Sequence, residues 1–257
     1  MNKVASRTGI LTYQANMDVI ANNMANINTT GYKPFRASLA DLIYTTRDYQ
    51  NEDTNYGHGV RMQKSDFMYE QGARHDTGMA LDFFAADNAF FSVEDVNGDR
   101  YYTKAGAFQI TQTEEPVYDA EGNLVTPPVW QLIEPQNGFI LDANGEHITI
   151  PFITGDDGTV TSDIDFAALE GMIGLFTFDN PYGLRAVGDN YFSVTESSGE
   201  ALASDTAELM RGALERSDVE MSREMVDMMV TQRAFSLNIN MLKTYSEMTT
   251  LVNNIKG

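Results

Sequence analysis

Both ends of this chain carry an apolar seam at helical spacing, and the pair of seams constrains the fold more than any other feature. Steps of three and four, the spacing of a coiled-coil seam, occur near the N-terminus at Ile10, Tyr13, Met17, Ile20, Met24 and Ile27. They recur near the C-terminus at Met221, Met225, Met228, Gln232, Phe235, Ile239 and Leu242, with a continuation at Met241, Tyr245, Met248, Val252 and Ile255. Two such helices most simply pack antiparallel, with the middle of the chain projecting from them.

The C-terminal helix is expected to begin at Ser217, because Ser217 and Glu220 have the spacing of a capping box. No glycine or proline follows before Gly257, so at 1.5 Å per residue this helix would be about 55 to 60 Å long. Such a helix needs a partner along its length. The N-terminal helix is expected to stop before Gly31, which suits a left-handed C-cap, and Pro34 prevents it from resuming.

The middle of the chain has the alternating period of β-strands. Strands are predicted at residues 60–63, 91–94, 101–103, 129–133, 148–150, 175–178 and 191–194, with turns at 97–98, 121–123, 144–145 and 156–158. The spacing of Leu39, Leu42 and Ile43 favours one or two helical turns. The predicted class is α+β: an N-terminal helical segment (1–44), a linker (45–59), an all-β body (60–196), a return loop (197–216) and a C-terminal helix (217–257).

Charge and composition exclude several classes of function. The 257 residues include 37 acidic and 17 basic side chains, a formal charge of −20, which repels nucleic acid and anionic membranes. The absence of cysteine excludes disulfides and thiolate sites. No run of eighteen apolar residues and no apolar leader region occurs, so neither membrane insertion nor a cleaved Sec signal is expected.

No catalytic, cofactor or metal constellation is found. The segment from Asp95 to Asp99 is oxygen-rich like a calcium loop, but it lacks the glutamate at position twelve and reads as a hairpin turn. His58, His75 and His147 follow no metal-binding spacing. We therefore predict that the protein has no cofactor and is not an enzyme.

Five amides crowd the N-terminal helix although asparagine is a poor helix former: Asn16, Asn22, Asn23, Asn26 and Asn28. One interpretation is a helix end stabilised by local side-chain bonds. The other is hydrogen bonding to neighbouring chains in a packed helical wall. The methionines of the C-terminal helix also allow two interpretations. They fill a core, or they form an adaptable seam against non-identical neighbours.

Four segments resemble one known family. Residues 18–33 (DVIANNMANINTTGYK) are similar to the N-terminal signature of bacterial flagellar basal-body rod and hook proteins, and residues 212–219 with 224–235 are similar to their C-terminal signature. The interior segments 102–108 and 178–184 also resemble rod proteins. One departure is that Asp87, Asn88 and Ala89 replace the usual glycine-rich turn before Phe90.

The resemblance implies a structural subunit of the flagellar basal-body rod that polymerises through its terminal helices into an axial tube and transmits torque from motor to hook. It implies an inner coiled-coil tube with the β domain facing outward. The implied partners are further copies of the chain, other axial rod and hook proteins, and the flagellar type III export apparatus. Chain length favours a distal-type or proximal-type rod protein over the larger hook protein.

The predicted subunit interface consists of the two seams and three amides: Ile10, Tyr13, Met17, Ile20, Asn22, Asn23, Met24, Asn26, Ile27, Met221, Met225, Met228, Gln232, Phe235, Ile239, Leu242, Tyr245, Met248 and Val252. Three alternatives stay open. They are a hook-type axial subunit, a secreted carbohydrate-binding or carbohydrate-active β protein with a sugar site at Trp130 and the tyrosine-rich strands, and an acidic chaperone-like coiled coil of the cytosol.

Overall fold

The chain divides into two compact units that alternate along the sequence. The computed structural model describes residues 3–42, 45–49, 52–114, 117–118, 124–126, 129–135, 138–154, 160–204 and 207–256. The first unit, called the helical unit below, comprises Met1–Ile27, Lys33–Met68 and Val219–Gly257. The second, called the β unit, comprises Asn28–Tyr32 and Tyr69–Asp218. The chain therefore passes between the units four times.

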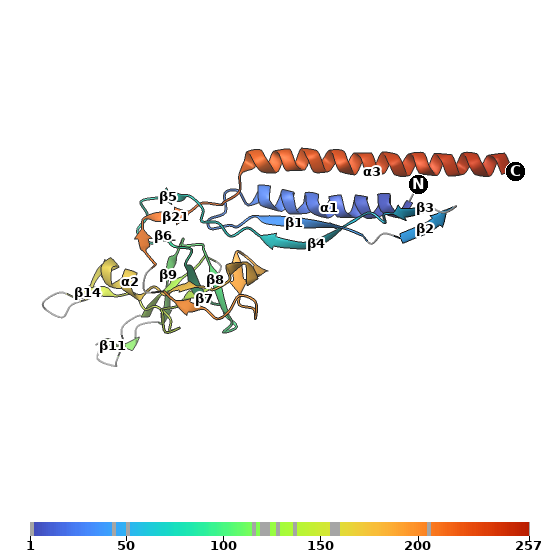
Figure 1. Ribbon diagram of the computed structural model, residues 1–257. Helices are drawn as coiled ribbons and strands as arrows, with labels where there is room; N and C mark the ends of the chain where they lie inside the picture. Colours follow the sequence, from blue (N-terminus) through green and yellow to red (C-terminus); the bar gives the residue numbers. More distant parts are fainter. Residues whose placement is uncertain are drawn as a thin grey trace. The chain divides into compact units, whose positions relative to one another are not determined.

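Two antiparallel helices form most of the helical unit, α1 (Lys3–Ala25) and α3 (Met221–Lys256). Figure 1 shows α1 between α3 and a ribbon of two strands. The contact between the terminal helices and the α+β class confirm the predicted fold class. The predicted start of the last helix at Ser217 was wrong: α3 begins four residues later, where the Glu220 carbonyl accepts hydrogen bonds from the amides of Arg223 and Glu224, both at 3.1 Å.

The ribbon consists of β1 (Phe35–Asp41) and β4 (Val60–Phe67), paired antiparallel with an irregularity after Ser38. Helical turns were expected near Leu39, and that prediction was wrong because pairing with β4 sets the backbone. Residues 45–59, expected to be a linker, contain a hairpin of β2 (Thr45–Tyr49) and β3 (Glu52–Tyr56). Ile43 lies outside the described residues.

The β unit is built on a nine-stranded antiparallel sheet. Along its main path the order is β17 (Arg185–Gly188), β18 (Tyr191–Ser193), β8 (Arg100–Thr103), β7 (Phe90–Glu94), β13 (Phe139–Ile140), β12 (Val129–Ile133) and β9 (Gln109–Glu114). β16 (Leu175–Thr177) pairs with β7 and with β19 (Leu202–Ala203). Strand β7 thus pairs with β8 on one side and with β13 and β16 on the other.

Four smaller pairs complete the unit: β5 (Arg74–Asp76) with β21 (Ala213–Glu215), β6 (Phe83–Ala85) with β20 (Leu209–Arg211), β10 (Val117–Tyr118) with β11 (Leu124–Thr126), and β14 (Phe152–Thr154) with β15 (Val160–Ile164). Residues 197–216 thus hold three short strands, β19 to β21, where a loop was expected. Residues 148–150, predicted as a strand, form no named strand: Thr149 makes an isolated bridge to Gln131, and the Ile150 amide donates a hydrogen bond to the Trp130 carbonyl at 2.8 Å. The turns predicted at 121–123 and 156–158 lie outside the described residues.

A short helix and a 3-10 turn interrupt the predicted all-β body. Helix α2 (Phe166–Met172) is capped by Asp165, whose Oδ1 accepts hydrogen bonds from the amides of Ala167 and Ala168 at 3.1 Å each. The 3-10 turn η1 spans Pro181–Gly183. The capping carboxylate was readable from the sequence, but strand periodicity on both sides obscured so short a helix.

The core of the β unit lies on the central strands. Phe91 is fully buried and packs edge-on against Phe108 with ring centroids 5.0 Å apart. The turn before β7 places Asp87 and Asn88 at φ of 53° and 60°. This left-handed backbone normally favours glycine, and aspartate and asparagine tolerate it better than other side chains, which explains how the chain makes this turn without glycine.

Candidate assembly surface

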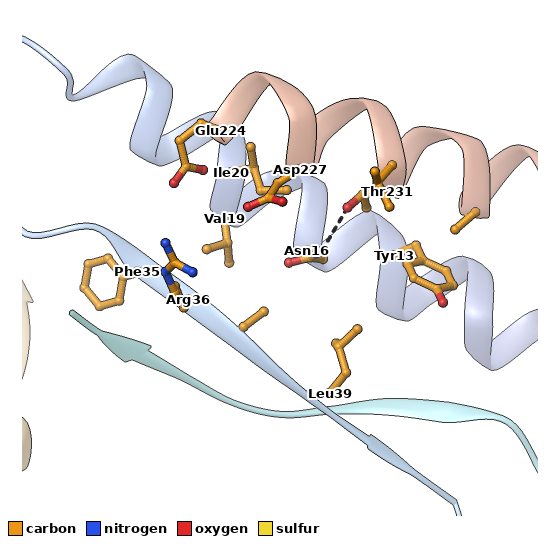
Figure 2. A pocket seen from close by; sticks show the side chains of 13 residues that line it. Tyr13, Asn16, Val19, Ile20, Phe35, Arg36, Leu39, Glu224, Asp227 and Thr231 are labelled. Atoms are coloured by element: carbon orange, nitrogen blue, oxygen red, sulfur yellow. Dashed lines mark hydrogen bonds between the residues drawn. The ribbon is translucent and has the colours of Figure 1, made fainter. Parts of the chain in front are cut away.

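Polar side chains set the register between α1 and α3. Asn16 donates a hydrogen bond from Nδ2 to Thr231 Oγ1 at 3.1 Å, drawn in Figure 2. Gly9 lies opposite Asn238 so closely that a Cβ at Gly9 would be 2.7 Å from Asn238 Oδ1. Both pairs place one residue of α1 against one residue of α3 in the same antiparallel register.

The β1–β4 ribbon is attached to α1 by side chains that replace missing backbone partners. Asn23, almost fully buried, donates from Nδ2 to the Phe35 carbonyl at 2.8 Å, and its Oδ1 accepts from the Phe35 amide at 2.9 Å. Thr12 donates from Oγ1 to the Val60 carbonyl at 3.0 Å. The ribbon is therefore held at both ends of the helix face that it covers.

The predicted interface residues fall into three groups by exposure. Ile20 and Asn23 are buried within the chain. Twelve are half-buried: Ile10, Tyr13, Met17, Met24, Asn26, Ile27, Met221, Met228, Phe235, Ile239, Leu242 and Tyr245. Five are exposed: Asn22, Met225, Gln232, Met248 and Val252. Most of the predicted seam is thus at least partly buried within a single chain, and its role between chains stays a prediction.

The amides of three asparagines act within the chain. Besides Asn16 and Asn23, Asn26 donates from Nδ2 to the Asn22 carbonyl at 2.9 Å, the local bonding that was one of the two interpretations. Asn22 and Asn28 are exposed. Bonding of these amides to neighbouring chains stays a prediction.

A second apolar face of α3 is exposed, and the sequence predicted only part of it. Half of the exposed large apolar side chains in the described part of the chain lie on α3. They are Met225, Val226, Met229, Val230, Leu237, Met241, Met248, Leu251, Val252 and Ile255, and we call them the α3 stripe. The predicted seam and its continuation include Met225, Met241, Met248, Val252 and Ile255. The signal available for the other five was that the helix is apolar on more than one side.

The end of α3 extends beyond the described part of α1. Since Gly9 lies opposite Asn238 in an antiparallel pair, Lys3 falls near the level of Thr244. All of residues 246–255 are exposed. An apolar helix end that the described part of its chain leaves exposed is a candidate contact surface.

An open groove of about 350 Å³ runs between α1, α3 and β1. Its walls mix apolar side chains such as Val19, Leu39 and Val230 with the charged Arg36, Glu224 and Asp227. Figure 2 shows the two carboxylates and the guanidinium directed toward the same end of the groove. We call this feature the acidic groove.

Charge is divided unequally between the two units. The residues of the helical unit include ten acidic and eleven basic side chains, a net +1, and those of the β unit include 27 and six, a net −21. Together they account for all 37 acidic and 17 basic residues of the chain. A nearly neutral helical unit can pack densely against other copies of itself. The β units of two copies repel each other electrostatically.

A buried ion pair in the β unit was also missed. Lys104 Nζ lies 3.4 Å from Glu215 Oε2, with side chains 0% and 2% exposed. Glu215 Oε1 accepts a hydrogen bond from the Gly72 amide at 2.8 Å. The Lys104 ammonium also lies 5.4 Å from the centre of the Phe90 ring. These residues are far apart in sequence, so no local pattern marks them as partners.

The backbone of the two ion-paired residues contacts the turn that follows α1. Gly31, at φ +65°, donates its amide hydrogen to the Glu215 carbonyl at 2.8 Å, and a Cβ on Gly31 would lie 2.6 Å from the Lys104 carbonyl carbon. The left-handed glycine expected from the sequence is therefore confirmed. Three of the segments that carry the family resemblance, around residues 31, 104 and 215, meet here.

Other candidate sites have structural explanations. Asp95 to Asp99 form a hairpin turn between β7 and β8, with the Gly98 amide donating to the Asp95 carbonyl at 2.8 Å. Trp130 is half-buried against the core of the β unit. Among the described residues, no cluster of three or more histidine, cysteine, aspartate or glutamate side chains is arranged to hold a metal ion. No helix within the same residues is long and apolar enough to cross a membrane.

Shifted pKa values in the β unit reflect packing. Burial raises the pKa of Tyr69, and the nearby Glu215 carboxylate raises it further. Burial also raises the pKa of Tyr191, whose hydroxyl donates a hydrogen bond to Glu134 Oε2. Both phenols therefore stay protonated at neutral pH and act as hydrogen-bond donors.

Comparison with known proteins places the chain in a family. Residues 7–33 match the family described as flagella basal body rod protein, residues 86–163 the flagellar hook protein FlgE/F/G D1 domain, and residues 210–255 the flagellar basal body rod FlgEFG protein C-terminal. The chain is 32% identical to the flagellar basal-body rod protein FlgG of Borreliella burgdorferi, over 97% of its own length and 96% of that protein. The chain belongs to the flagellar basal-body rod protein family.

Other relatives agree with this membership. The FlgG rod protein of Agrobacterium fabrum is 33% identical over 95% of each chain, and the flagellar hook-basal body complex protein FlhP of Bacillus subtilis is 27% identical over 98% of each. The chain is FlgG-like, a structural and non-enzymatic protein of the flagellar basal-body rod. As a member of this rod protein family, it assembles with other axial components.

Proposed function

We propose that copies of this chain polymerise through α1 and α3 into an axial tube that transmits torque from motor to hook, with the β unit on the outside. Within that array its neighbours are further copies and other rod and hook proteins, and the chain reaches the array through the flagellar type III export apparatus. The observation that carries the proposal is the α3 stripe. This stripe leaves a long apolar face exposed in the isolated chain, and association removes such a face from water.

The division of charge supports the orientation. The helical unit has a net charge near zero, so many helices pack together without accumulating repulsion. The β unit, with a net charge of −21, is better placed where water and salt screen it. The same argument supports α1 and α3 as the assembling part of the chain and the β unit as its solvated part.

The first test alters the stripe without touching the fold. Leu237→Asp places a charge on a side chain that is 63% exposed, so the monomer should keep its circular dichroism spectrum and melting temperature. We expect loss of sedimenting polymer from purified protein and loss of rescue in motility of cells lacking the gene. Val187→Asp is the matched control, because Val187 is also exposed, at 50%, but lies in the β unit.

The second test removes the end of the last helix. Deleting residues 246–257 takes away only side chains that the described chain leaves exposed through residue 255. We expect a folded monomer that is absent from purified basal bodies. Normal assembly of both this deletion and Leu237→Asp would overturn the proposed function.

A further inference from the structure

The acidic groove holds two carboxylates that form no ion pair within the described part of the chain. Glu224 is only 5% exposed, yet within the described residues its carboxylate has neither an ion pair nor a side-chain hydrogen bond. Asp227 lies one turn further along α3 and is exposed. A carboxylate with so little exposure, at the wall of an open groove, is stabilised by an incoming cation.

Arg36 on strand β1 faces the two carboxylates but does not pair with them. Its Nε is buried and has no hydrogen-bond partner among the described residues, and it forms no ion pair with Glu224 or Asp227 there. Figure 2 shows its guanidinium below the two carboxylates. The groove end therefore presents two acceptors for a cation and one donor that lacks an acceptor, with apolar walls beside them.

The chain itself carries a side chain of complementary chemistry on another face. Arg7 of α1 is exposed and has no ion pair or hydrogen bond in the described part of the chain. Val4 and Leu11, one turn before and one turn after it, are 53% and 59% exposed. This Val4–Arg7–Leu11 face offers a cation between two apolar contacts, which matches carboxylates flanked by apolar walls.

We propose that the acidic groove of one copy receives the Val4–Arg7–Leu11 face of a second copy, with Arg7 placed between Glu224 and Asp227. This contact rests on the proposed assembly through α1 and α3 and specifies one of its interfaces. Groove and face are different surfaces of the same chain. The contact is therefore heterologous, and a heterologous contact that does not close into a ring adds copies without limit.

Cysteine cross-linking tests the geometry, because the native chain has no cysteine to interfere. In the double variant R7C and D227C, oxidation of assembled protein should give a ladder of covalent multimers on a non-reducing gel. Either single variant should give no species larger than a dimer. The matched control is R233C with D227C, since Arg233 is also exposed on a helix of the same unit but is not the proposed partner.

Charge exchange tests the chemistry. Arg7→Glu and Asp227→Arg should each raise the critical concentration for polymerisation about tenfold, and the double variant should return it toward the wild-type value. Both side chains are exposed, so circular dichroism should show an unchanged fold.

Three outcomes separate this contact from the proposed function. Polymers that form without the R7C–D227C ladder, or a charge-exchange double variant that gains nothing over the single variants, would overturn the groove contact and leave the proposed function intact. An R233C–D227C ladder equal to that of R7C–D227C would also overturn it. Wild-type protein that never assembles, alone or in the rod, would overturn both.

Discussion

The two units of this protein bury their apolar surface in opposite ways. In the described part of the helical unit, the buried apolar side chains are Ile20, Phe67 and Val219, while α3 exposes its stripe. The β unit instead encloses a cluster that includes Phe83, Phe91 and Leu132, all fully buried. The β unit thus encloses its apolar core within a single chain, whereas the described part of the helical unit leaves much of its apolar surface exposed.

The comparison separates stability from assembly. Substitutions in the β unit should act on folding of the monomer, and substitutions on the exposed faces of the helical unit should act on association. Because the same chain contains both, each variant can be measured for both properties.

The sharpest contrast is between Phe91→Ala and Leu237→Ala. Removing the Phe91 ring leaves a cavity in the sheet core and should lower the free energy of unfolding by about 3–5 kcal/mol. Leu237→Ala removes an exposed side chain and should change the same quantity by less than about 0.5 kcal/mol. Urea unfolding of the monomer measures both. Equal losses would erase the distinction between the units.

Breaking the buried ion pair is the next largest change. Lys104→Met leaves the Glu215 carboxylate buried without its cation, which should cost about 3 kcal/mol of unfolding free energy. The double variant Lys104→Met with Glu215→Leu should recover part of the loss, because neither charge is then left buried alone.

The helical unit supplies a matched control for that pair. Lys64 Nζ and Asp66 Oδ2 are closer, at 2.7 Å, but their side chains are 63% and 45% exposed. Lys64→Met should therefore cost no more than about 1 kcal/mol. A larger loss for the exposed pair than for the buried pair would contradict the argument from burial.

The turn before β7 should respond to backbone preference alone. Asn88→Val forces a β-branched residue into φ of 60° and should destabilise the β unit by about 1–2 kcal/mol. Asn88→Gly should be neutral or stabilising, because the hydrogen bonds at this residue come from its backbone. Thermal melts of the two variants compare these outcomes directly.

The smallest predicted effect depends on pH. Burial alone would raise the pKa of Asp142, but hydrogen bonds from Glu146, Asn144 and Gly145 hold it below its usual 3.8. The ionised form of Asp142 is thus favoured in the folded state. Its contribution to the free energy of unfolding is fully present above the pKa of the unfolded state, and it disappears as the pH falls through the lower pKa of the folded state. Asp142→Ala should cost about 0.5–1.5 kcal/mol at pH 7 and progressively less below pH 3.8. A loss of unfolding free energy that is the same at every pH would contradict stabilisation by the ionised Asp142 carboxylate.

The sequence predicted the helices well because their signal is periodic and local. Steps of three and four from Ile10 to Ile27 and from Met221 onward located α1 and α3, and Gly31 located the turn. The end points were less accurate: serine and glutamate at 217 and 220 imitate a cap, yet the helix begins at Met221.

Long-range partners limited the remaining predictions. Leu39 lies at helical spacing from Leu42, but pairing with β4 makes its segment a strand. Lys104 and Glu215 each look like ordinary surface charges in sequence, and only the folded β unit brings them together. The acidic groove likewise needs α1, α3 and β1 in place before Glu224 and Arg36 lie on one surface.

The alternation of the chain between its units has a mechanical consequence. Because the polypeptide enters and leaves the β unit twice, at residues 27–28 and 32–33 and again at 68–69 and 218–219, four covalent links share any load that pulls the units apart. A single protease cut at one of these crossings would leave the two units covalently joined through the other three. Separating the two units under load therefore requires all four crossings to break. Two domains in simple tandem are joined by a single crossing and lack this redundancy.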